Sequence, residues 1–298
     1  MNYNKPFVSV ADQIATLKAR GLTVKNIPKA TSYLSNISYY RLRAYTYPFQ
    51  DNNVPNHPFT TVISFEDIID LYVFDRQFRL FVLDTIEKIE ISFRTQIIYN
   101  WAMHHGSHWH TIQSLYRNAG QFIKDSSRLQ QEVDRSTETF ISHYKNTYTS
   151  PTDPPCWMSL EVASMGLLSI IFQNLKNGPE KAAVVKYYGL NKVDILENWM
   201  HAFSNIRNIC AHHSRLWNRR LTTHITIPKY PANNFISNKH ILPYKMYASL
   251  SCMKYILDII SPGNSFAKRL KDLMQKCPLA QEKEMGFPAN WTREPFWQ

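Results

Sequence analysis

The stretch from Thr60 to His105 contains neither glycine nor proline, and it limits what this 298-residue chain can fold into more than any other feature. The apolar residues that recur along it at steps of three to five are Leu71, Phe74, Phe78, Phe81, Ile86, Ile89, Phe93 and Ile97. Because this spacing lines one face of a helix, the stretch predicts a single long helix that ends near Gly106. Ser64 followed by Asp67 resembles a capping box for its start.

Shorter helical patterns lie on both sides of the long stretch. Val10, Ile14 and Leu17 follow a candidate N-cap, Ser9, and indicate a first helix over residues 8–21. Further helices are expected over residues 29–40, 122–133, 138–144, 157–174, 180–187, 193–214, 244–260 and 266–275.

The fold class follows from these patterns and from the scarcity of glycine. Residues 219–227 are rich in Thr and Ile and are the one segment predicted to be extended, and 8 glycines are few for the turns of a sheet-rich fold. We therefore predict a mainly α protein, a helical bundle with a long central helix. Residues 1–58 are expected to form an N-terminal helical extension and residues 59–298 a helical domain, with both in one compact unit.

The charge balance favours an anionic partner. The chain has 34 Lys and Arg against 23 Asp and Glu, a net charge of +11. Such an excess attracts phosphate and releases the counterions condensed on nucleic acid. A generally basic surface with no such partner is the alternative.

From other sequence features we expect the chain to be cytoplasmic. No run of 18 apolar residues is present and the N-terminus has no apolar signal-peptide core, so we expect neither a membrane span nor secretion. The four cysteines stand far apart and match neither a zinc site nor a disulfide framework. They are Cys156, Cys210, Cys252 and Cys277.

The densest group of reactive side chains lies between residues 204 and 220. It holds four arginines, two adjacent histidines and three further asparagines. Cleaving an RNA phosphodiester without a metal needs a group that moves protons near neutral pH and fixed cations that stabilise charge on the phosphoryl oxygens. Histidine supplies the first and arginine the second. The arginines are Arg207, Arg215, Arg219 and Arg220.

The spacing within this group is informative but not sufficient. Asn208 and His212 are four residues apart and share one face of a helix. Arg207 and His212 are five apart, so they converge only through the long arginine stem, a frayed helix end or a second subunit. The alternative is a helix end whose Arg and His side chains only interact with its C-terminal carbonyl groups.

Three further groups are weaker candidates. Arg41 and Arg43 alternate with four tyrosines between residues 39 and 47, a composition suited to stacking bases, or to packing on the bundle with the arginines turned outward. Arg94 lies one turn from Glu90 and is expected to pair with it, with a place in an RNA groove as the alternative. The histidines of residues 104–110 lack the spacing and partners of a zinc site.

Two other residues are assigned structural roles. Glu161 has no evident catalytic partner and is predicted to be a buried structural carboxylate. Cys210 has small apolar neighbours and is predicted to be packed in the core. We expect no metal ion and no cofactor.

Residues 207–218 (RNICAHHSRLWN) resemble the signature of the abortive-infection (Abi) family of the AbiD/AbiF type, within the HEPN superfamily. The resemblance extends along the chain in order. Its other blocks are residues 37–45 (ISYYRLRAY), 86–95 (IEKIEISFRT), 155–162 (PCWMSLEV) with 166–169 (GLLS), and 285–288 (MGFP) with Trp291.

The resemblance implies a helical HEPN domain, a role in phage defence, and metal-independent RNA cleavage at a composite site built from two facing motifs. One motif per chain then implies a homodimer. By position, Arg207 would stabilise the phosphate, Asn208 would orient it and His212 would be the acid or base, with His213 as second choice. The alternatives are a non-catalytic RNA-binding module of a defence or toxin–antitoxin system, and a structural helical protein in which Arg207 pairs with a carboxylate of its own chain.

Overall fold

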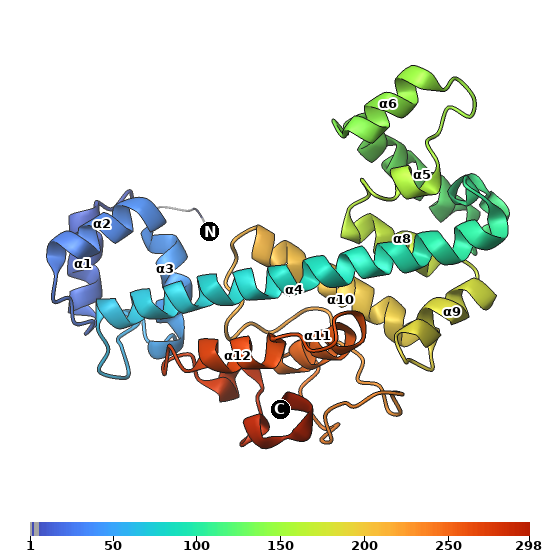
Figure 1. Cartoon of the computed structure of the whole chain (residues 1–298). Coiled ribbons are helices and arrows are strands. Elements are labelled where there is room, and N and C mark those ends of the chain that lie inside the picture. The colour runs from blue at the N-terminus through green and yellow to red at the C-terminus, as the bar shows by residue number, and fades with distance from the viewer. Residues whose placement is uncertain (1, 3–5) are drawn as a thin grey trace. The chain divides into compact units, whose positions relative to one another are not determined.

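The computed structural model describes residue 2 and residues 6–298, and within them the chain is mainly helical with twelve α-helices and no β-strand. The α-helices are α1 Val10–Ala19, α2 Ile27–Ile37, α3 Tyr39–Thr46, α4 Phe65–His105, α5 Ala119–Asp134, α6 Thr139–Thr147, α7 Cys156–Ser159, α8 Met165–Asn174, α9 Pro179–Tyr187, α10 Val193–Ala211, α11 Met246–Ile260 and α12 Phe266–Met274. The mainly α prediction is confirmed (Figure 1).

The chain divides into two compact units, and the predicted domain boundary at residue 58 stays a prediction. Unit 1 comprises residues 1–79 and 272–281, and unit 2 comprises residues 80–271 and 282–298. The division falls within α4: residues 65–79 of this helix belong to unit 1 and residues 80–105 belong to unit 2.

The long helix begins where its capping box predicts. The Ser64 N–H donates to a carboxylate oxygen of Asp67 at 2.8 Å, and the Asp67 N–H donates to the Ser64 hydroxyl at 3.2 Å. These reciprocal bonds satisfy N–H groups that the first helical turn leaves unpaired. The Ser64 hydroxyl also donates to the Asp67 carboxylate at 2.7 Å, and this bond together with that from the Ser64 N–H lowers the pKa of Asp67. The helix then runs unbroken for 41 residues.

Unit 1 holds α1, α2 and α3, with α2 in contact with both of the others (Figure 1). Inside this unit the buried hydroxyl of Tyr45 on α3 donates to Asp75 on α4 at 2.6 Å, and Arg79 pairs with the same carboxylate. The helix predicted over residues 29–40 is instead divided at Ser38 into α2 and α3, and the buried polar network fixes α3 to α4.

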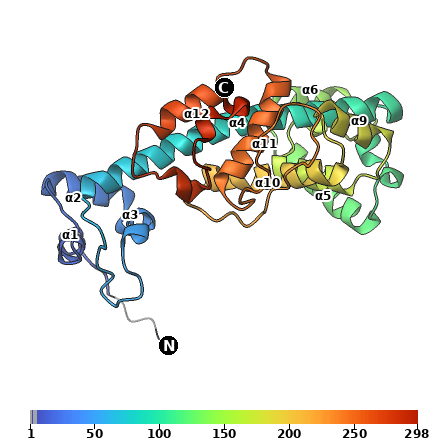
Figure 2. The ribbon, with the colours of Figure 1, turned by 90° about the horizontal axis from the view of Figure 1, so that it is seen from below.

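Unit 2 is built around α8 and α10, which pack along each other, with α5 on α8. Helix α11 lies beside α10 (Figure 2). Lys181 on α9 is fully buried within this unit. Its ammonium group donates to Glu197 on α10 at 2.6 Å and to the Leu175 carbonyl at 2.8 Å. A carboxylate and a carbonyl thus compensate for burial of the charge and connect three elements.

The predicted helix over residues 157–174 is wrong, because the chain forms two helices, α7 and α8, separated by a turn. Side chains from other helices form hydrogen bonds with backbone groups that would bond to each other within a continuous helix. Glu132 accepts from the Ser164 N–H at 2.6 Å, and Arg94 donates to the Ala163 carbonyl at 2.8 Å. Glu161 lies in this turn with about half of its side chain exposed, so its predicted burial is also wrong.

No helix in the described part of the chain is both long enough and apolar enough to cross a lipid bilayer.

Candidate functional site

The end of α10 carries the candidate catalytic residues in a well-defined capping motif. The His213 N–H donates to the Cys210 carbonyl and the Ser214 N–H donates to the Ile209 carbonyl, both at 3.0 Å. This pair of bonds is a Schellman motif, which closes a helix with one residue in the left-handed conformation. That residue is His213, with φ of 56°.

A histidine at this position is unusual. Glycine normally occupies it, because a side chain in the left-handed conformation costs about 1–2 kcal/mol. Backbone strain of this kind gathers at functional sites, where the surrounding structure maintains it. The predicted helix end is thus confirmed. His213 carries a side chain at a position where the backbone conformation favours glycine.

Four polar side chains form one stripe on α10, at spacings of four, three and four residues. They are His201, Asn205, Asn208 and His212. Three of them are exposed and Asn205 is half-buried. Its amide Nδ2 lies 3.2 Å from His201 Nε2. The predicted neighbours Asn208 and His212 therefore belong to a longer polar surface, which we call the α10 stripe.

Arg207 lies next to this stripe and is exposed. Within the residues that the structure describes, its guanidinium makes no ion pair and no hydrogen bond. The alternative in which Arg207 pairs with a carboxylate of its own chain is therefore not supported. Its five N–H donors remain available to an external anion.

A longer sequence signal surrounds the motif. Residues 198–257 contain no Asp and no Glu, whereas they contain eight Lys and Arg. These sixty residues therefore contribute +8 of the formal net charge of +11. The spacing of reactive residues does not reveal this stretch, whereas the distribution of charge along the chain does. The stretch extends the candidate surface beyond the motif.

The segment after the motif runs back along α10. Asn205 donates to the Thr223 hydroxyl at 2.6 Å. Nearer the start of α10, Asn198 donates to the His224 carbonyl at 3.0 Å and accepts from the Thr226 N–H at 2.7 Å. The predicted extended element at residues 219–227 is not a β-strand, because side chains of α10 take the place of a neighbouring strand.

Two of the predicted phosphate-binding arginines lie on this segment. Arg220 is exposed, and its guanidinium carbon is 4.1 Å from the ring centre of Tyr244. The His224 ring lies 5.5 Å from the same tyrosine ring. Arg219 donates to the carbonyl of Arg215 at 3.2 Å, and both arginines are half-buried. Tyr244 thus contacts both Arg220 and His224, and neither Tyr244 nor His224 was among the predicted site residues.

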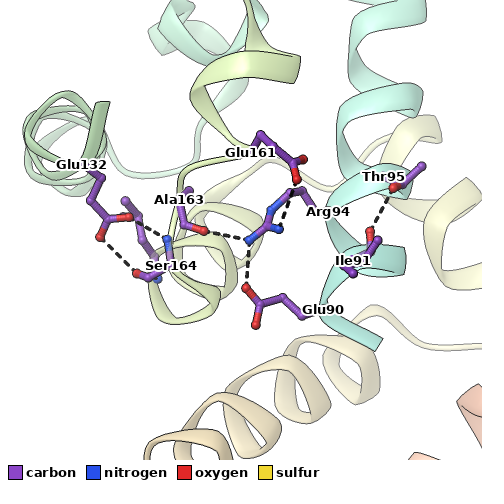
Figure 3. Close-up of polar contacts among 9 residues, drawn as sticks. Glu90, Ile91, Arg94, Thr95, Glu132, Glu161, Ala163 and Ser164 are labelled. Atoms are coloured by element: carbon purple, nitrogen blue, oxygen red, sulfur yellow. Dashed lines mark hydrogen bonds and ion pairs between the residues drawn. The ribbon is translucent and has the colours of Figure 1, made fainter. Parts of the chain in front are cut away.

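Arg94 has a structural role (Figure 3). Its guanidinium donates to Glu90 at 2.8 Å and to the Ala163 carbonyl at 2.8 Å, and lies 3.8 Å from Glu161. Only 8% of the residue is exposed. The predicted ion pair with Glu90 is confirmed. The alternative, in which Arg94 contacts RNA, is not supported, because its guanidinium is buried.

Arg41 and Arg43 belong to unit 1, on α3. Arg41 is exposed, and the guanidinium carbon of the half-buried Arg43 lies 6.0 Å from the ring centre of Tyr47. Tyr40 is 86% exposed, an unusual position for a large aromatic ring. The composition that suggested base stacking is therefore presented on the surface of this unit, and its contact with RNA stays a prediction.

The histidines at the end of α4 and in the segment that follows it make contacts within the chain. His105 Nε2 lies 3.0 Å from a carboxylate oxygen of Glu180, and His108 Nε2 lies 3.0 Å from the Asp153 carbonyl oxygen. His110 is 6% exposed, and burial, reinforced by His108, lowers its pKa to about 4. Cys210 is buried as predicted.

Comparison with known proteins gives one result. A family model described as Abi-like protein matches residues 32–218, more than half of the chain, including α10 and its end. No curated protein and no solved structure matches.

Proposed function

This chain belongs to the Abi-like protein family, and from this membership we propose that it acts in abortive infection as a metal-independent endoribonuclease, of the AbiD/AbiF type within the HEPN superfamily. The family description supports the role in defence. The chemistry rests on the residues at the end of α10.

One observation carries the proposal: Arg207, Asn208 and His212 are exposed together at a helix end, within sixty residues that contain no carboxylate. A carboxylate near these groups would compete with phosphate for the arginine. Residues 198–257 contribute only positive formal charge to the surface around the motif, which suits a polyanionic partner.

The proposed reaction needs no group beyond these side chains. The ribose 2′-hydroxyl attacks the adjacent phosphorus and loses its proton to an imidazole, and the bond to the 5′-oxygen breaks as that oxygen receives a proton. Arg207 stabilises the charge on the non-bridging oxygens, and Asn208 orients the phosphate. The products are a 2′,3′-cyclic phosphate and a 5′-hydroxyl.

Two imidazoles are needed if one accepts a proton while another donates one. His212 and His213 are adjacent, but His213 lies past the helix end in the left-handed conformation. We therefore propose that His212 of one protomer works with His212 of a second, in a homodimer that brings the two helix ends together. His213 is the second choice for the same role.

The test is induced expression of the wild type, Arg207→Ala and His212→Ala, with cell growth and RNA integrity as readouts. We expect the wild type to arrest growth and fragment RNA, with cyclic phosphate at the new 3′ ends, and both variants to lose at least 100-fold of the cleavage rate. Arg128→Ala and His143→Ala change exposed residues of α5 and α6 and serve as matched controls.

Equal toxicity of all five proteins with intact RNA would exclude catalysis at this site. Binding of RNA without cleavage by the purified wild type would instead favour the non-catalytic module. Sedimentation of the wild type tests the dimer separately.

A further inference from the structure

The cationic and aromatic side chains beside the motif form a second feature of the same surface. Resting on the proposed function, we propose that Arg220, Tyr244 and His224 form a stacking platform for a base of single-stranded RNA a few nucleotides from the cleaved phosphate. All three residues lie beyond residue 218, outside the part of the chain that the family model matches.

Arg220 and His224 both contact the ring of Tyr244, and we call these three residues the column. The Arg220 guanidinium carbon lies 4.1 Å from the Tyr244 ring centre, within the range of a cation–π contact. The His224 ring centre lies 5.5 Å from the tyrosine ring at an interplanar angle of 46°. Tyr244 is half-buried, whereas Arg220 and His224 are exposed. The column therefore presents two flat polar groups to solvent.

Backbone bonds fix the column before any ligand arrives. The Leu221 N–H donates to the Tyr244 carbonyl at 2.9 Å, and the Ile225 N–H donates to the Pro243 carbonyl at 3.0 Å. Asn198 on α10 holds the His224 carbonyl at 3.0 Å. Two stretches of chain and one helix thus set the positions of the three groups, which lowers the entropy lost on binding.

The column lies near the proposed reacting groups. Thr223, next to His224, accepts a hydrogen bond from Asn205, which is seven residues before His212 on the α10 stripe. Seven residues of helix correspond to about 10 Å. This is close to three stacked nucleotide steps of about 3.4 Å each. A strand whose phosphate meets Arg207 can therefore place a nearby base on the column.

The chemistry of the column distinguishes single-stranded RNA from a duplex, but it does not distinguish one base sequence from another. Guanidinium and imidazole planes stack on any base, because every base has a π-face. The bases of a duplex are already stacked on both faces and cannot take this position without unpairing. Arg220 makes no hydrogen bond or ion pair in the described residues, so its N–H groups can also contact the backbone phosphate.

The test uses the His212→Ala protein, in which cleavage is blocked, and a six-nucleotide RNA carrying 2-aminopurine, an adenine analogue whose fluorescence falls on stacking. We expect fluorescence to fall on binding. Tyr244→Leu, His224→Ala and Arg220→Ala should each prevent most of this fall and weaken binding by about 5- to 100-fold. The last two change exposed side chains, which keeps the test valid if Tyr244→Leu is unstable.

Tyr230→Leu is the matched control, because Tyr230 is 68% exposed in the same carboxylate-free stretch and lies 5.3 Å from the ammonium of Lys229. RNA binding with unchanged fluorescence, or platform variants that behave like Tyr230→Leu, would overturn the platform and leave the nuclease proposal standing. Equal affinity for a duplex would also overturn the platform. Failure to bind any RNA would remove both proposals.

Discussion

The side-chain amide of Asn205 donates a hydrogen bond to the hydroxyl of Thr223 at 2.6 Å, which fastens the chain after the motif to the helix before it. Together with the two bonds of Asn198, this contact makes an irregular segment a fixed part of the surface. The groups proposed to bind RNA on that segment therefore owe their positions to α10.

Removing the side chain that forms two of these hydrogen bonds should destabilise the segment. Asn198→Ala deletes the acceptor of the Thr226 N–H and the donor to the His224 carbonyl. We expect the free energy of unfolding to fall by about 1–2 kcal/mol, because each such bond contributes about 1 kcal/mol. Hydrogen exchange at Thr226 should accelerate. Thr222→Ala, an exposed change in the same segment, should leave both quantities unaltered.

The left-handed backbone of His213 gives a prediction that does not depend on its side-chain contacts. His213→Gly and His213→Ala remove the same side chain, but only glycine adopts φ of 56° without strain. We expect the glycine variant to be the more stable by about 1 kcal/mol in urea unfolding. Equal stability, or a more stable alanine variant, would contradict the strain.

The same pair of variants addresses catalysis. If His212 is the acid or base, both His213 variants should retain cleavage within about tenfold. Loss of activity in both, with the helix end intact by hydrogen exchange, would assign the role to His213.

Burial of His110 predicts a stability that depends on pH. Its pKa falls from 6.5 to about 4 in the folded chain. Between these values the unfolded chain binds more protons, so the free energy of unfolding decreases as the pH falls. Between pH 7 and pH 5 this residue should account for a loss of about 2 kcal/mol. Urea unfolding of His110→Leu should lack that part of the pH dependence, whereas the exposed control His143→Ala should keep it.

Lys181 gives a prediction about the core of unit 2. Lys181→Met removes the buried ammonium that contacts Glu197 and the Leu175 carbonyl, while Arg117 still lies 3.1 Å from the same carboxylate. We expect a loss of about 3 kcal/mol in the free energy of unfolding, because the Leu175 carbonyl loses its ammonium donor and the mostly buried Glu197 keeps only one of its two cationic partners. Lys186→Met on the exposed side of the same helix should change it little. A loss below 1 kcal/mol would contradict this account.

The sequence was sufficient to predict an element wherever the residues that form its hydrogen bonds or its apolar face lie within one short segment. Ser64 and Asp67 predicted the start of α4 because a capping box pairs groups three residues apart. The absence of glycine and proline, with apolar residues on one face, predicted its length. The polar cluster at residues 207–213 was placed on a helix end for the same reason.

Where a distant side chain decides the outcome, the same reasoning failed. The helix predicted over residues 157–174 is interrupted because Glu132 and Arg94, from two other helices, bind the backbone of Ser164 and Ala163. No local pattern contains these partners. The burial of Arg94 and the exposure of Glu161 follow from the same interruption.

The amino-acid sequence by itself determined that the chain is helical, that α4 is long, and that Arg207, Asn208 and His212 share a helix end, because hydrogen bonding and periodicity act over a few residues. Only the tertiary structure decided that Tyr244 contacts both Arg220 and His224, because bringing residues twenty or more positions apart into contact depends on how the intervening chain packs.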